Sequence, residues 1–223
     1  MSRYRYILGM TLLLLAAGCR SEPEPMETGA TRIETARVDE RPVILFLGDS
    51  LTAGYHLDPE DAFPALIQRR IDAERDGDWR AVNAGVSGDT TADGLNRLNW
   101  VLRQPVDVLV LALGANDALR GQPIENIQRN LDQILERTRE RYPEVRFVIA
   151  GMQMPHNYGA QYTAAFRALF VELAEKYDAA LIPFLLEGVA GDPSLNLRDG
   201  IHPTEAGHEI IADTVWTYLE PLL

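Results

Sequence analysis

Short apolar runs alternate with amphipathic segments from residue 43 almost to the C-terminus. Five of these runs predict β-strands, which are expected at residues 43–47, 81–83, 106–113, 145–150 and 180–182. The run at 106–113 is apolar at nearly every position, which is typical of a strand covered on both faces of a parallel sheet. The pattern therefore predicts a sheet with helices on both sides.

Each predicted strand is followed by a segment with apolar residues at helical spacing. The clearest helix is expected at 124–141, where Ile127, Leu131 and Ile134 share one face and Pro123 suits the first turn. The other helices are expected at residues 62–73, 91–102, 160–177 and 204–218. Five successive strand–helix units predict one α/β domain, a three-layer α/β/α sandwich.

The first 18 residues have the composition of a secretory signal peptide. Arg3 and Arg5 precede an apolar stretch at 7–17, which is too short to span a bilayer. The sequence LAAGC at 15–19 resembles the end of a bacterial lipoprotein signal, although Ala16 stands where that signal usually has leucine. We therefore predict a signal peptide at 1–18 and lipidation of Cys19, with simple secretion as the alternative. Cys19 is the only cysteine, which excludes an intrachain disulfide.

Residues 19–41 are polar and acidic and show no sustained periodicity, which predicts a disordered tether. Residues 42–223 are then expected to form the globular domain. The chain carries a net charge of −12, and removal of Arg3 and Arg5 with the signal would bring the charge to −14. This acidic balance argues against a nucleic-acid partner and against attraction to anionic lipid surfaces.

Four polar motifs lie at or near the predicted ends of strands or before the last helix: GDSLTAGY at 48–55, NAGVSGDTT at 83–91, GAND at 114–117 and DGIHP at 199–203. In this order they resemble the four blocks of the SGNH (GDSL-type) hydrolases, most of all the bacterial periplasmic acyl-thioesterases, lysophospholipases and arylesterases. The resemblance runs from about residue 43 to residue 215. It implies a flavodoxin-like five-stranded parallel sheet with strand order 2-1-3-4-5. In that order, the motifs of Ser50 and Asn116 flank the crevice where the fold binds ligands.

Ser50 is the candidate nucleophile, because a serine just past a buried strand combines a rigid backbone with an accessible hydroxyl. The hydroxyl attacks only when a base takes its proton, and His202 is the candidate base. Asp199, three residues earlier, can accept a hydrogen bond from Nδ1 of His202 and leave Nε2 facing the serine. The predicted catalytic residues are therefore Ser50, Asp199 and His202.

A tetrahedral intermediate of acyl transfer needs hydrogen-bond donors for its oxyanion. The candidates are the backbone N–H groups of Ser50 and Gly85 and the side-chain amide of Asn116. An ordinary turn at Gly85 and a helix cap at Asn116 are the alternatives. The remaining polar residues near these motifs are expected to shape loops, to accept structural hydrogen bonds or to be solvated; they are Asp49, Ser87, Asp89, Asp117 and His208.

The segment after the fourth predicted strand offers apolar and aromatic side chains at Met154, Pro155, Tyr158 and Tyr162. In the family branch, this region resembles the loop that closes over the acyl chain of the substrate. We therefore expect these four residues to bind substrate, with a plain surface loop as the alternative.

The resemblance implies a serine hydrolase that cleaves carboxylic esters or thioesters through an acyl-enzyme, and no metal or other cofactor is expected. The partners are expected to be small acyl esters, thioesters or lysophospholipids, with membrane contact through the lipid anchor only. A monomer is expected in the bacterial periplasm, anchored to the outer membrane. Two alternatives stay open: a short-chain deacetylase of envelope sugars, and a non-catalytic, flavodoxin-like binding lipoprotein that would carry a flavin.

Replacing Cys19 by Ser should release the protein from membranes or leave its signal uncleaved, because the anchoring acyl chains could no longer be attached. Partitioning of the native protein and the variant between detergent and aqueous phases measures this. Equal membrane retention of both proteins would contradict the predicted anchor.

Overall fold

The computed structural model describes residues 39–223, so the predicted signal peptide, Cys19 and most of the predicted tether lie outside the described residues. A five-stranded parallel sheet forms the centre of the described part, with the strand order β2-β1-β3-β4-β5. The strands are β1 (Val43–Gly48), β2 (Arg80–Gly85), β3 (Val108–Ala112), β4 (Arg146–Ala150) and β5 (Ala180–Ile182). The predicted fold class and strand order are confirmed.

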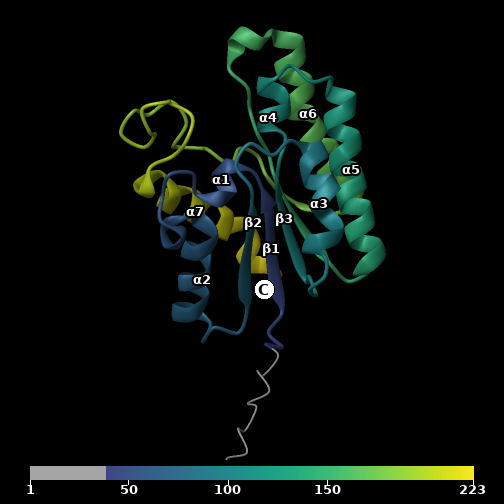
Figure 1. The fold of residues 1–223 in the computed structure, drawn as a ribbon, viewed down its shortest axis with the longest axis vertical. Coiled ribbons are helices and arrows are strands. Elements are labelled where there is room, and N and C mark those ends of the chain that lie inside the picture. Colours follow the sequence, from purple (N-terminus) through teal and green to yellow (C-terminus); the bar gives the residue numbers. More distant parts are fainter. Residues whose placement is uncertain (1–38) are drawn as a thin grey trace, which may run out of the picture. The chain divides into compact units, whose positions relative to one another are not determined.

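Helices cover both faces of this sheet (Figure 1). On one side α2 (Phe63–Glu74) packs against α7 (Glu205–Leu219). On the other side α5 (Ile124–Arg141) packs against α3 (Thr91–Val101) and α6 (Ala160–Tyr177). Five of these helices match predicted segments to within a residue or two. The shorter elements are α1 (Ser50–Ala53), α4 (Ala115–Leu119), and the 3₁₀ turns η1 (Pro59–Asp61), η2 (His156–Tyr158) and η3 (Glu220–Leu222).

The apolar runs form the two central strands because both faces of those strands are covered. Every residue of β1 and β3 is buried. Helix α5 presents Ile127, Leu131 and Ile134 to the core, as its periodicity predicts. Burial of each such side chain stabilises the fold by about 1.5–3 kcal/mol. The carboxyl ends of β1 and β3 are therefore held rigidly, and α1 and α4 begin at those ends.

The short helices α1 and α4 were not predicted. A helix of four or five residues is too short to show a periodic pattern, and its formation depends on caps and tertiary contacts. Helix α1 has both kinds of cap. The Asp49 carboxylate accepts a hydrogen bond from Leu51 N–H at 3.0 Å. Gly54 ends the helix in the left-handed conformation, with φ of 75°.

The interpretation of His208 as a solvated residue is wrong. Its side chain on α7 is buried, with 1% of the residue exposed, and the ring stacks on Phe63. Nδ1 of His208 accepts a hydrogen bond from the backbone N–H of Phe63 at 3.1 Å, which satisfies a donor at the start of α2. Burial lowers the pKa of His208 from 6.5 to about 4, so the ring is neutral in the folded protein at neutral pH.

Replacing His208 by Asn should flatten the acid limb of the stability curve. As the pH falls below 6.5, the unfolded chain protonates this histidine and the folded chain does not, so the native protein loses stability until the pH reaches about 4. That loss amounts to about 3 kcal/mol, and Asn retains an acceptor without a titratable group.

Urea unfolding at pH 7, 5.5 and 4 measures the free energy of unfolding of both proteins. The two curves should converge or cross as the pH falls, because all other titrating groups are shared. Parallel curves would contradict the buried, neutral state of His208.

Candidate active site

Ser50 lies at the point where β1 passes into α1, as the first residue of that helix. Its backbone is fixed by the helix, since the Ser50 carbonyl accepts from Gly54 N–H and Tyr55 N–H at 3.1 Å each. The residue is largely buried, with 9% of its surface exposed. Ser50 is therefore held rigidly on a capped helical turn, just past the buried strand.

Gly85 lies beside this turn at the end of β2. A Cβ atom at Gly85 would lie 2.3 Å from the Ala53 nitrogen and 2.7 Å from the Thr52 carbonyl carbon, so a larger residue would push α1 away. The Asn83 side chain reinforces the contact, because its Nδ2 donates to the Thr52 carbonyl at 2.9 Å. The close packing of α1 on β2 therefore requires glycine at position 85. The sequence did not reveal this requirement.

Asp199 and His202 lie in the loop that precedes α7. The Leu197 N–H donates to the His202 carbonyl at 2.7 Å, and the Thr204 N–H donates to the Leu195 carbonyl at 2.9 Å. Gly200 lies inside the turn that these two bonds close and adopts the left-handed conformation, with φ of 70°. The loop is thereby closed into a narrow turn, in which the His202 ring reaches Ser50 of α1 and the Asp199 carboxylate contacts His202.

The structure brings Ser50, His202 and Asp199 into one hydrogen-bonded chain. Nε2 of His202 lies 2.9 Å from Oγ of Ser50, and Nδ1 lies 2.8 Å from Oδ2 of Asp199. Hydrogen bonds from the backbone and ring of His202 and from Ile201 N–H lower the pKa of Asp199 to about 2. Because the carboxylate can only accept, Nδ1 carries the ring proton and Nε2 is free to accept from the serine hydroxyl.

The three candidate oxyanion donors differ in their present partners. Among the described residues, no acceptor pairs with the Ser50 N–H. The Gly85 N–H donates to Oδ1 of Asn83 at 2.9 Å. The Asn116 amide donates to the Asp89 carbonyl at 3.0 Å and to Oδ2 of Asp49 at 3.2 Å. The Gly85 N–H and the Asn116 amide are therefore already oriented by other acceptors. A bound oxyanion would share these two donors with those acceptors or replace them.

Asp49 is a buried carboxyl group that contacts both α1 and Asn116. Burial raises its pKa to about 6, against the hydrogen bond from Leu51 N–H and the attraction of His202, which favour the charged form. The same carboxyl accepts from the Asn116 amide and caps α1, so one side chain links the ends of β1 and β3. These contacts fit the structural role expected for Asp49.

Asp117 and Asp89 also accept structural hydrogen bonds. Asp117 accepts from the backbone N–H and the hydroxyl of Thr91, at 2.8 and 2.6 Å, at the start of α3. Asp89 forms an ion pair with Arg97 at 2.6 Å, and Arg97 also donates to the Gly48 carbonyl at 3.1 Å. Arg97 thus connects the loop after β2 to the end of β1, a role that the motifs did not indicate.

Tyr55 contacts the candidate base, and the sequence analysis missed this contact. Its ring centroid lies 4.3 Å from that of His202, with an angle of 38° between the planes. Tyr55 has a second aromatic neighbour, since its ring centroid lies 4.0 Å from that of His56. The position of Tyr55 within the first motif was the available signal, but nothing in the sequence indicates which ring it meets.

The predicted substrate residues divide into two groups. Met154 is half-buried against the core, whereas Pro155 is exposed. Tyr158 and Tyr162 line a groove of about 690 Å³ between the start of α6 and residues 121–125. Their hydroxyls donate to the carbonyls of Leu119 and Gln122, at 3.4 and 2.7 Å. The two tyrosines therefore join η2 and the start of α6 to the segment that follows Asn116.

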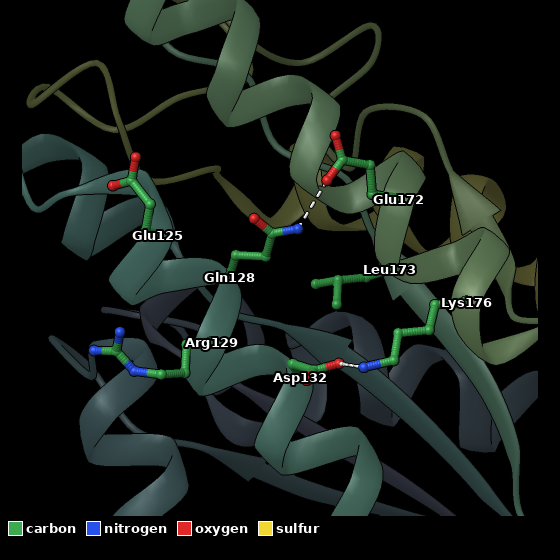
Figure 2. Close-up of a pocket in the computed structure, with 7 residues that line it drawn as sticks. All are labelled: Glu125, Gln128, Arg129, Asp132, Glu172, Leu173 and Lys176. Carbon is green, nitrogen blue, oxygen red and sulfur yellow. Dashed lines mark hydrogen bonds and ion pairs between the residues drawn. The ribbon is translucent and has the colours of Figure 1, made fainter.

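A second groove, of about 430 Å³, lies between α5 and α6 and is shown in Figure 2. Polar pairs cross it: Gln128 donates to Glu172 at 2.8 Å, and Lys176 pairs with Asp132 at 2.5 Å. None of its lining residues belongs to the Ser50 group, and the two polar pairs join α5 to α6 across it. We interpret it as a solvated helix–helix seam.

Neither a metal-binding cluster nor a membrane-crossing helix is found in residues 39–223. No group of three or more His, Cys, Asp or Glu side chains in this part of the chain is arranged to hold a metal ion. None of its helices has the length and apolar character needed to cross a bilayer.

A doubly wound α/β sandwich with a hydrogen-bonded serine, histidine and aspartate beside the carboxyl ends of its strands has the arrangement of a serine hydrolase. Residues 46–210 match the model of the GDSL-like Lipase/Acylhydrolase family. The chain belongs to this family. The predicted class, an SGNH (GDSL-type) enzyme that hydrolyses esters or thioesters, is confirmed.

Curated relatives and solved structures agree with this assignment. Esterase TesA of Pseudomonas aeruginosa is 40% identical over 181 residues, which cover 81% of this chain and 89% of the relative. Thioesterase 1/protease 1/lysophospholipase L1 of Escherichia coli K12 is 37% identical over 190 residues, which cover 85% of this chain and 88% of the relative. The crystal structure of TesA matches with a TM-score of 0.76 at 39% identity, over 81% of this chain and 99% of that chain.

Proposed function

We propose that the protein hydrolyses carboxylic esters or thioesters through an acyl-enzyme on Ser50. The observation that carries this proposal is the position of the His202 ring, which lies 2.9 Å from the serine hydroxyl and 2.8 Å from the Asp199 carboxylate. A base at hydrogen-bond distance from a rigidly held hydroxyl is what nucleophilic catalysis by serine requires.

In the first half of the reaction, Oγ of Ser50 attacks the acyl carbon while its proton moves to Nε2 of His202. Asp199 holds the ring and stabilises the imidazolium that forms. The bond to the leaving group then breaks, and the alcohol or thiol leaves with the proton from Nε2. In the second half, water gives a proton to Nε2 and attacks the acyl-enzyme. The acid is released and Ser50 regains its proton.

The oxyanion is proposed to bind the backbone N–H groups of Ser50 and Gly85 and the amide of Asn116. Support comes from their common position at the carboxyl ends of β1, β2 and β3. Loss of one such donor typically lowers turnover by about 10²–10³. Asp49 would hold the Asn116 amide in place, because the two side chains are hydrogen-bonded at 3.2 Å.

The substrate range and location are proposed from the sequence and the relatives. The printed names of the relatives include esterase, thioesterase and lysophospholipase. We propose that this enzyme takes small acyl esters, thioesters or lysophospholipids, with the acyl chain near Met154, Pro155, Tyr158 and Tyr162. We further propose a periplasmic monomer anchored to the outer membrane through Cys19.

A fluorophosphonate probe should label Ser50, because only a base-activated hydroxyl attacks such reagents quickly. Labelling is measured by mass spectrometry of the digested, folded protein. Ser50→Ala should abolish both labelling and ester hydrolysis. Ser87→Ala is the matched control, since Ser87 lies in an exposed loop beside Gly85, and it should leave labelling intact. Labelling at Ser87, or none in folded protein, would refute the assignment.

Replacing Tyr158 and Tyr162 together by Ala should reduce kcat/KM for decanoyl esters far more than for acetyl esters. Each methylene of the acyl chain that is buried against this surface contributes up to about 0.8 kcal/mol, so the penalty should grow with chain length. The series from acetyl to decanoyl nitrophenyl esters measures this dependence.

The double replacement by Phe is the control for the hydrogen bonds of the two hydroxyls. It removes the hydrogen bonds to Leu119 and Gln122 and keeps the apolar rings. If apolar contact sets the preference, the Phe variant should keep the chain-length profile of the native enzyme. An equal loss at every chain length in the Ala variant would mean that the tyrosines only support the loops.

A further inference from the structure

Four of the large apolar side chains that are exposed in the described part of the chain lie close in sequence to candidate site residues. They are Tyr55, Val86, Leu119 and Ile201, with 36–49% of their surfaces exposed. Each follows or precedes a different candidate, namely Ser50, Gly85, Asn116 and His202. Of the four, Tyr55 contacts the His202 ring, and Ile201 directly precedes His202 in the chain.

The base determines where the leaving group of an ester must lie. The same Nε2 that takes the proton from Ser50 gives it to the departing oxygen or sulfur, so the leaving group must pass next to the His202 ring. Tyr55 packs on that ring at 4.3 Å and is 36% exposed, and Ile201 precedes His202 and is 49% exposed. The loop that carries His202 and the segment that carries α4 lie on different sides of α1 in Figure 1.

The backbone of the turn after α1 supplies a second, independent observation. The Leu57 N–H donates to the Gly54 carbonyl at 3.0 Å, and His56 occupies the left-handed region with φ of 63°. A side chain in this conformation is uncommon, and such residues concentrate at functional sites. The turn places the exposed His56 ring 4.0 Å from the Tyr55 ring, so His56, Tyr55 and His202 form a continuous row of rings.

We infer that Tyr55, His56 and Ile201 form the leaving-group subsite of this enzyme and favour uncharged aromatic leaving groups. Aromatic rings prefer edge-to-face or offset contacts with one another, which this row offers beside the base. The exposed acidic residues Asp58 and Glu60 lie two and four positions after His56 in the chain, and their negative charge disfavours anionic leaving groups. This inference rests on the proposed function, since it uses His202 as the proton donor.

The experiment measures leaving-group selectivity at a constant acyl group. The selectivity is the ratio of kcat/KM for 2-naphthyl acetate to kcat/KM for ethyl acetate. In Tyr55→Leu this ratio should fall about two- to tenfold, as expected for the loss of one aromatic contact. Tyr55→Phe should keep the native ratio. The matched control is Trp100→Leu, an exposed ring near the end of α3 and away from the Ser50 group, which should also keep it.

A binding measurement makes the result independent of turnover. Inhibition by 2-naphthol should weaken by the same factor in Tyr55→Leu, whereas inhibition by ethanol should not change. His56→Gly is the second variant, because glycine suits the left-handed backbone and keeps the turn while removing one ring. It should lower the selectivity ratio in a protein at least as stable as the native one.

The outcomes separate the subsite from the proposed function. An equal fall in both rates in Tyr55→Leu, with unchanged naphthol inhibition, would overturn the subsite and leave Tyr55 as a support for His202. An unchanged ratio in active Tyr55→Leu and His56→Gly variants would overturn it as well. A native enzyme that hydrolyses neither ester and does not label at Ser50 would instead overturn the proposed function.

Discussion

The backbone of α1 lies so close to the end of β2 that position 85 has no room for a side chain, with a Cβ atom there only 2.3 Å from Ala53 N. This contact places Ser50 beside the carboxyl ends of the sheet, where Asn116 and Gly85 also lie. It also sets the direction of the turn that carries Tyr55 and His56. Helix α1 has only four residues and no independent stability, so its position depends on this packing and on the Asp49 cap.

Two aspartates near the site, Asp199 and Asp49, have pKa values shifted in opposite directions because their surroundings differ. Asp199 is partly exposed and accepts several hydrogen bonds, so its pKa is lowered to about 2 and it remains charged beside His202. Asp49 is buried, so its pKa is raised to about 6. Asp117 is also buried and is held by Thr91. The first suits the role of orienting a base, whereas Asp49 links α1 to Asn116 and Asp117 links α4 to the start of α3.

The prediction from sequence succeeded where the signal was periodic. Helices α5 and α6 have the predicted bounds, because long amphipathic patterns report the buried face directly. It failed for α1 and α4, whose few residues show no period, and for His208, whose polar side chain pairs with the Phe63 N–H of a distant helix. A partner 145 residues away leaves no trace in the local pattern.

The sequence by itself determined the strand–helix alternation, the polar motifs after the strands and the pairing of Asp199 with His202 across one turn. These depend on local spacing, which a chain carries without reference to its fold. Only the tertiary structure decided that the His202 ring faces Ser50, that Gly85 is needed for the α1 contact and that Tyr55 packs on the His202 ring. Those contacts join residues up to 152 positions apart, and their geometry is set by the packing of the sheet and helices rather than by neighbouring residues.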